Sequence, residues 1–172
     1  PEYVLKDGEA LYVDWGCIYE HYFSDTGTTL AVGGLPGELE ERYRLLIECM
    51  DAGSDRIEPA TAASEVQAAM WDALAAGGVT ASFPHGHGLG VEIRDYPIIV
   101  PNNGLRIRDD CVDVSSDLPL EPGMVLNLEA AIFMPGAGSI HNERSFVVTP
   151  EGSRELVPQQ RSRPVVPEEV TL

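Results

Sequence analysis

Apolar and polar residues alternate along residues 10–17, the period-two pattern of a β-strand with one buried face. Residues 22–30 are rich in aromatic and threonine side chains and are predicted to form the antiparallel partner of that strand. Two more strands are predicted at residues 124–133 and 145–149, separated by a Pro- and Gly-containing turn at residues 134–138.

Between these strand pairs, apolar residues at helical spacing predict two helices. The first follows Pro36, carries acidic residues in its first turn and is expected to end at Gly53. The second covers about residues 61–76. Their predicted buried faces are formed by Tyr43, Leu46, Ile47 and Met50 and by Val66, Met70 and Leu74.

The order of strands, then two helices, then strands predicts an α+β fold, with both helices on one face of a curved antiparallel sheet. Residues 1–172 are enough for a single domain, and residues 153–172 are expected to form a loosely packed C-terminal tail. The first strand begins close to Pro1, and two helices give little cover for such a sheet. We therefore expect a domain that is incomplete at its N-terminus, as a fragment or as a domain completed by another chain.

The chain is strongly acidic, with 28 acidic and 11 basic residues and a net charge of −17. This charge argues against nucleic-acid binding and favours cationic partners or metal ions. No apolar run approaches the length of a membrane span, and no signal peptide is recognisable, so no membrane partner is expected. Three cysteines without a CxxC pair argue against a disulfide framework and fit a reduced compartment, so a cytoplasmic location is expected.

Two aspartates stand out in the first predicted hairpin. If its turn is centred on Tyr19-Glu20, Asp14 and Asp25 lie directly opposite each other and point to the same face of the sheet. Two carboxylates in that position repel each other unless a cation lies between them. The alternative interpretation is that both are exposed residues of a turn or a sheet edge.

Three further residues invite the same question. Glu129 interrupts an apolar strand, where a buried carboxylate needs a proton, a cation or a metal ion. Glu143 begins the last strand, and the alternative for it is a salt bridge to Arg144 or another arginine. His87 lies among glycines in a segment that would leave its ring accessible, although a lone histidine is more often structural.

Taken together, these five residues offer one imidazole nitrogen and four carboxylates on strands that can converge. Such a donor set suits manganese, iron(II), cobalt or zinc. Because carboxylates can bridge, it could hold two ions about 3.5–4 Å apart, the usual spacing of a two-metal hydrolytic centre.

Four segments of the chain resemble, in order, the motifs of the pita-bread metallopeptidases, a family that includes methionine aminopeptidase, aminopeptidase P, prolidase and the metal-free creatinase. The resemblance is closest to the Xaa-Pro peptidase branch and covers the C-terminal, metal-binding part of its catalytic domain. The segments are Val13-Asp14-Trp15-Gly16 with Tyr22-Phe23-Ser24-Asp25-Thr26, then Gly86-His87-Gly88-Leu89-Gly90, then Leu120-Glu121-Pro122-Gly123-Met124 through Glu129, and Glu143 through Val147-Val148-Thr149.

The resemblance implies a role for each of the five residues. Asp14 would chelate one metal ion, Asp25 and Glu143 would bridge both ions, and His87 and Glu129 would complete the second ion's ligands. Glu129 would also act as the catalytic proton carrier. Two divalent transition-metal ions are implied as cofactors, manganese first, with cobalt, iron or zinc as alternatives, and homodimers are common in the family.

Two departures from the family pattern concern substrate binding. Arg94 stands where a second histidine is usual, and an arginine there can clamp a carboxylate but does not shuttle protons. His141 stands where an arginine is often found. Either His141 or His85 is a candidate to replace the missing histidine, because both lie near ligand segments, so all three are assigned to substrate binding.

The resemblance implies an Xaa-Pro aminopeptidase or dipeptidase that acts on short peptides through a metal-bridging water. The second interpretation is a non-peptidase enzyme on the same scaffold, a C–N hydrolase or lyase acting on a small molecule. The third is a binding module that has lost catalysis.

Overall fold

The computed structural model of the chain describes residues 3–136 and 138–158. Its elements follow one another in the order β1 (Ala10–Trp15), β2 (Ile18–Tyr19), β3 (Tyr22–Phe23), β4 (Thr26–Ala31), α1 (Gly37–Asp55), α2 (Ala63–Ala76), β5 (His85–Gly88), β6 (Asp95–Ile99), β7 (Arg106–Asp109), β8 (Val112–Ser115), β9 (Val125–Met134), β10 (Gly138–Thr149) and β11 (Gly152–Glu155).

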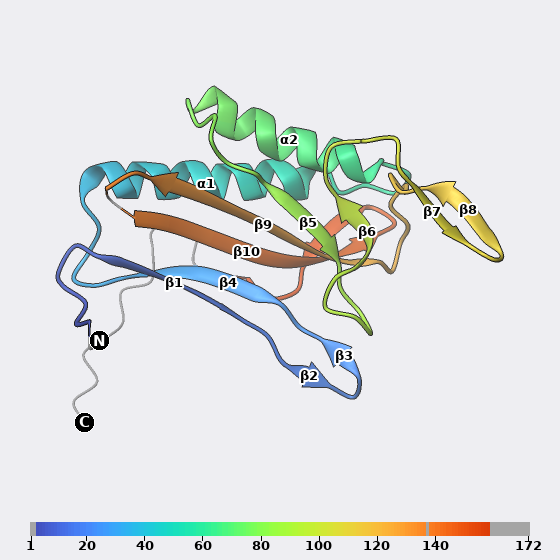
Figure 1. Cartoon of the computed structure of the whole chain (residues 1–172), viewed down its shortest axis with the longest axis horizontal. Helices are drawn as coiled ribbons and strands as arrows, with labels where there is room; N and C mark the ends of the chain where they lie inside the picture. Colours follow the sequence, from blue (N-terminus) through green and yellow to red (C-terminus); the bar gives the residue numbers. More distant parts are fainter. Residues whose placement is uncertain (1–2, 137, 159–172) are drawn as a thin grey trace.

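The centre of the fold is an antiparallel sheet in the strand order β1-β4-β10-β9-β5-β6, with β11 paired to β10. Helices α1 and α2 lie together on one face of this sheet, while the β2–β3 and β7–β8 ribbons project from it (Figure 1). The expected α+β architecture is therefore confirmed. No helix in the described part of the chain is long and apolar enough to cross a membrane.

The sheet divides its side chains cleanly between its two faces, because successive residues of a strand point in opposite directions. On β9, Leu126, Leu128 and Ala130 are buried in the same apolar cluster as α1 and α2. All seven residues predicted for the helix faces belong to that cluster, which confirms the two helical stripes. The alternate residues, including Asn127 and Glu129, consequently point to the face away from the helices.

The register of the first hairpin differs from the prediction by two residues. Asp14 pairs with Gly27, not with Asp25. The turn lies at Glu20-His21, where both residues have positive φ (48° and 72°), as in the tight turns that match the twist of a hairpin. The two aspartates still come together, because ligand atoms of Asp14, Asp25 and Glu143 all lie within 4.8 Å of one another.

Several predicted boundaries were wrong. The segment 22–30 is two strands, β3 and β4, interrupted at Ser24 and Asp25, and strands β5 to β8 were not predicted as such. Helix α1 continues past Gly53, where an added Cβ would lie 2.6 Å from Met70 Cγ, so this glycine permits close contact of the two helices and does not end the first. Strand β10 begins at Gly138, seven residues before the predicted start at residue 145.

The C-terminal segment is ordered further than expected. Residues 153–155, assigned to the loosely packed tail, are part of β11 and pair with β10. Glu155 receives two hydrogen bonds from the buried guanidinium of Arg144, from Nε at 2.9 Å and Nη2 at 3.0 Å, and Arg144 Nη1 donates to Asp51 of α1 at 2.8 Å. Of the predicted tail, residues 159–172 lie outside the described residues.

Candidate metal centre

A row of site residues crosses the sheet on the face away from the helices. Asp14 on β1 lies opposite Gly27 on β4, Gly27 opposite Glu143 on β10, Glu143 opposite Glu129 on β9, and Glu129 opposite His85 on β5. Five neighbouring strands thus bring residues from four separate sequence segments to one line. Cross-strand partners have Cβ atoms about 4.5–5.5 Å apart, so these carboxylates are forced into proximity by the sheet itself.

The carboxylates form two overlapping groups. Ligand atoms of Asp14, Asp25 and Glu143 all lie within 4.8 Å of one another, and so do those of Glu129, His141 and Glu143. Glu143 belongs to both groups and is buried. A carboxylate shared between two donor groups is the arrangement that a bridging ligand requires.

His87 directs an unpaired nitrogen at this cluster. Its Nδ1 lies 2.9 Å from the carbonyl oxygen of Gly88 and donates to it, which leaves the lone pair on Nε2. Nε2 is buried and has no hydrogen-bond partner among the described residues, and it lies 3.6 Å from Asp25 Oδ2 and 3.7 Å from Glu129 Oε1. Burial lowers the pKa of His87 and so favours this neutral form. A metal ligand needs this tautomer and orientation.

The glycines beside His87 let the strands close around it. A Cβ at Gly86 would lie 2.4 Å from the carbonyl oxygen of Asn127, and one at Gly88 would lie 2.3 Å from that of Tyr96. The close backbone approach expected of this segment is therefore present. The accessible imidazole expected with it is not, since His87 is only 1% exposed.

Glu129 is held in its ionised form by several cationic neighbours. Its Oε1 accepts from His85 Nε2 at 2.7 Å and from Arg94 Nη2 at 3.0 Å. Burial opposes the charge on Glu129, but the hydrogen bond from His85 and the positive charges of His85 and Arg94 outweigh it and lower the pKa of Glu129 to about 2. For His85, burial is likewise outweighed by the hydrogen bond to Glu129, and the pKa of His85 is raised.

Asp25 is in the opposite situation. Burial and the carboxylates of Glu143, Asp14 and Glu129 raise the pKa of Asp25 to about 6, and only Arg94 acts against them. A cation placed between these carboxylates would offset their repulsion and stabilise the ionised form of Asp25. The repulsion expected for opposed aspartates is thus present, although it comes from a wider group of acids than the predicted pair.

The three residues assigned to substrate binding surround the carboxylates. Arg94 and His85 contact Glu129, and His141 Nε2 lies 2.7 Å from Glu143 Oε1. Arg144, the alternative partner considered for Glu143, lies among the residues facing the helices and binds Glu155 and Asp51. The described contacts therefore do not support that alternative for Glu143.

Three polar residues that the sequence did not single out position the cluster. Asn127 Nδ2 donates to Glu143 Oε2 at 3.3 Å, and Ser145 Oγ donates to the backbone oxygen of Asp25 at 3.0 Å. Thr29 Oγ1 binds both the backbone oxygen and the backbone nitrogen of His141. Asn127 and Ser145 lie two residues from Glu129 and Glu143, so the period of two was the signal that could have found them.

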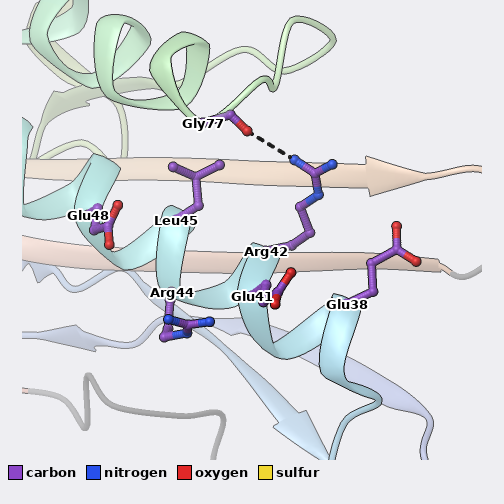
Figure 2. A pocket seen from close by; sticks show the side chains of 7 residues that line it. All are labelled: Glu38, Glu41, Arg42, Arg44, Leu45, Glu48 and Gly77. Carbon is purple, nitrogen blue, oxygen red and sulfur yellow. Dashed lines mark hydrogen bonds between the residues drawn. The ribbon is translucent and has the colours of Figure 1, made fainter.

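A separate hollow lies on the helix layer. It is lined by Glu38, Glu41, Arg42, Arg44, Leu45, Glu48 and Gly77 (Figure 2). Arg42 Nη1 donates to the carbonyl oxygen of Gly77 at 3.3 Å, which satisfies an acceptor at the end of α2. The three glutamates are spread along α1 without converging on a common point, so the hollow offers no comparable donor set (Figure 2).

The donor set of the sheet face suits divalent transition-metal ions. Four carboxylates bring more negative charge than Arg94 and the neighbouring histidines balance, and the orphaned Nε2 of His87 needs a partner. Carboxylate and imidazole together favour manganese, iron, cobalt or zinc over the alkaline-earth ions, which prefer oxygen ligands alone. The residues present therefore fit metal binding.

Comparison with known proteins agrees with this chemistry. Residues 1–150 match metallopeptidase family M24. An uncharacterized peptidase of Bacillus subtilis, YqhT, is 32% identical over 155 residues, 89% of this chain and 40% of that protein. The Xaa-Pro dipeptidase of Pyrococcus horikoshii is 26% identical over 91% of this chain and 42% of its own length. The chain thus spans about two fifths of the curated relatives it matches.

Solved structures show the same fold. Dipeptidase PepE from Mycobacterium ulcerans superposes with a TM-score of 0.81 at 30% identity, covering 94% of this chain and 41% of the other. Prolidase from Pyrococcus furiosus gives a TM-score of 0.78 at 26% identity, covering 91% and 43%. These neighbours confirm the pita-bread fold expected from the motifs. The family match over residues 1–150 includes all four motif segments. The chain belongs to metallopeptidase family M24.

Proposed function

We propose that this chain is the metal-binding part of a dinuclear-metal-dependent hydrolase that cleaves short peptides at an Xaa-Pro bond. The observation that carries the proposal is the convergence of Asp14, Asp25, Glu129 and Glu143 on one face of the sheet, with the unpartnered Nε2 of His87 directed at them. Family membership and the Xaa-Pro dipeptidase and prolidase among the similar proteins support the reaction class.

Each ligand is assigned from its neighbours. Asp14, Asp25 and Glu143 would hold one ion. Glu129, Glu143 and His87, whose Nε2 lies 3.7 Å from Glu129 Oε1 and 3.6 Å from Asp25 Oδ2, would hold the other, and Asp25 and Glu143 are the bridging candidates. Manganese is the first candidate, with cobalt, iron and zinc as alternatives. When bound, such ions act as Lewis acids on a carbonyl group and lower the pKa of water.

The chain's own residues position the reacting groups. Glu129 is the candidate proton carrier, because its carboxylate is ionised and its orientation is fixed by His85 and Arg94. Asn127 fixes the orientation of Glu143 in the same way. Both carboxylates are therefore presented in defined positions, which lowers the reorganisation needed during reaction.

Arg94 is the candidate group for recognising the substrate's C-terminus. Its side chain is 59% exposed, and Nη2 donates to Glu129 Oε1 at 3.0 Å, so a largely exposed guanidinium is anchored beside the carboxylates. A guanidinium binds a carboxylate through two parallel hydrogen bonds. This arrangement favours dipeptides, whose free carboxylate lies close to the cleaved bond.

A non-peptidase reaction on the same site is the second candidate. The pairing of Arg94 with Glu129 places a fixed cation beside the carboxylates, where a small anionic substrate could be held without a peptide backbone. C–N hydrolysis or lyase chemistry of a small molecule would use the same ligands. Homodimer formation and a cytoplasmic location stay predictions.

The reaction class is tested by assaying the purified chain on a panel of Xaa-Pro dipeptides, longer Xaa-Pro peptides, and small amidino and sulfonio compounds. The chain is first stripped with chelator and then reloaded separately with manganese, cobalt, iron or zinc, and products are identified by mass spectrometry. Metal-dependent cleavage of dipeptides that Glu143→Gln abolishes is expected. Turnover of the small compounds alone would favour the second candidate.

A further inference from the structure

His141 lies close to the carboxylates and is mostly buried, although it was assigned to substrate binding. Its Nε2 lies 2.7 Å from Glu143 Oε1, and its side chain is only 12% exposed. One ring nitrogen of His141 and one oxygen from each of Glu129 and Glu143 all lie within 4.8 Å of one another. The imidazole is therefore part of the donor cluster itself and not of its rim.

The fold positions both the backbone and the ring of His141. Thr29 Oγ1 donates to the backbone oxygen of His141 at 2.8 Å and accepts from its backbone nitrogen at 2.9 Å. The Tyr12 ring lies 5.3 Å from the imidazole, centroid to centroid. At Gly27, a Cβ would come within 2.9 Å of His141 Nε2 and Cδ2, so the missing side chain there provides the space that the ring occupies.

His85 offers a contrast on the other side of Glu129. Its Nε2 lies 2.7 Å from Glu129 Oε1 and its Nδ1 lies 3.0 Å from the carbonyl oxygen of Phe83. With both ring nitrogens directed at oxygen acceptors, His85 is arranged as a double donor and has no lone pair for an ion. Proximity to a glutamate alone therefore does not make a histidine a ligand candidate at this site.

We propose that His141 is a further metal ligand, bound to the ion that Glu129 and Glu143 hold. This rests on the proposed function, since it requires the two-ion centre. It raises the donor set from five residues to six and the number of imidazole ligands from one to two. The two ion positions already differ in chemistry, because Asp14, Asp25 and Glu143 offer oxygen only, whereas the position at Glu129 includes the imidazole of His87. A second imidazole there would strengthen its preference for zinc, cobalt or nickel.

The proposal is tested by proton NMR of the full chain loaded with cobalt(II). Each histidine that binds high-spin cobalt through Nε2 contributes one strongly shifted, solvent-exchangeable ring N–H signal, so the signals count the imidazole ligands. Wild type should show two signals, and His141→Ala and His141→Gln should each show one. Calorimetry should show affinity for one of the two ions reduced by at least the roughly 10–100-fold that loss of a supporting residue costs, with the other ion retained.

The variants separate a ligand from a positioning residue. Glutamine can still donate a hydrogen bond to Glu143, so recovery of wild-type affinity in His141→Gln would show positioning and overturn the proposal. His85→Ala is the matched control and should keep both signals; loss of a signal there, with none lost in His141→Ala, would also overturn it. Two bound cobalt ions with a single signal would refute His141 alone, whereas absence of cobalt binding in folded wild type would refute the proposed function with it.

Discussion

Glu129 and Glu143 lie directly opposite each other in the β9–β10 ladder, on the face of the sheet away from the helices. Like charges in that position destabilise a sheet. Each is balanced separately, Glu129 by His85 and Arg94, and Glu143 by His141 and Asn127. Among the described contacts Asp25, close to Glu143, has no comparable donor, and burial together with the carboxylates of Glu143, Asp14 and Glu129 raises the pKa of Asp25. The centre is thus an incompletely neutralised group of carboxylates that a divalent ion would stabilise.

Gly27→Ala should damage the centre without breaking the backbone. Its φ is not in the positive region, so alanine fits the local conformation, but the new Cβ would lie 2.9 Å from the His141 ring and 3.1 Å from Glu143 Cδ. Crowding of this kind costs about 1–3 kcal/mol. Urea unfolding of the chelated protein should show that loss, together with weaker metal binding. Gly37→Ala, where no atom lies within 4 Å of the added Cβ, should show neither effect.

In the chelated, metal-free protein, the free energy of unfolding should depend on pH through the titration of Asp25. The pKa of Asp25 is about 6 in the fold against an ordinary value of 3.8, so the folded protein keeps a proton that the unfolded chain releases between these values. The resulting stabilisation is complete below about pH 3.8 and is lost as pH rises through 6. Wild type should therefore lose free energy of unfolding relative to Asp25→Asn across this interval, with a constant deficit above it. An unchanged difference from pH 3.5 to 7.5 would contradict the assignment.

Arg144→Met should cost about 3–5 kcal/mol, because it leaves Glu155 and Asp51 without their buried guanidinium partner. The matched control is Arg154→Met, an exposed arginine on the neighbouring strand, which should change stability by less than about 0.5 kcal/mol. Urea unfolding with chelator in both samples separates this effect from metal binding. Equal stabilities of the two variants would show that the ion pairs of Arg144 contribute little to the free energy of unfolding.

Arg94→Ala should weaken the use of substrates that end in a free carboxylate close to the cleaved bond. Losing a hydrogen bond to a charged group costs about 1.5–3 kcal/mol, so KM for Xaa-Pro dipeptides should rise roughly tenfold or more, with a smaller change in kcat. The same peptides with a C-terminal amide are the internal control and should respond much less. A KM increase of equal size for acids and amides would argue that Arg94 acts only on Glu129.

The sequence predicted the α+β class, both helices and the five residues that the fold brings together on one face of the sheet. Apolar spacing located both helices and their buried faces, and each of the five ligand candidates was an acid or histidine out of place in an apolar or glycine-rich segment. The hairpin register was wrong by two residues, but Asp14 and Asp25 still lie in one donor group with Glu143. The local pattern could not predict which residues far apart in the sequence contact each other.

Three features depended on that pairing. The partner of Arg144 could not be read from its neighbour Glu143, since adjacent strand residues point to opposite faces and its acceptors come from α1 and β11. Gly53 resembled a helix end, but its role is set by Met70 of the other helix. The glycines around His87 suggested an open ring, yet the backbone contacts they permit bring neighbouring strands close and leave the imidazole buried.

The most direct measurement is the metal content of the purified chain, by elemental analysis after reconstitution and removal of excess ion. Close to two transition-metal ions per folded chain are expected, with at least one lost in Asp25→Ala. The bound ions should also stabilise wild type, by about 2.7 kcal/mol for a single site when free metal is 100-fold above Kd. A folded wild-type chain that retains no metal, and whose thermal unfolding is unaffected by added manganese, cobalt, iron or zinc, would contradict the account.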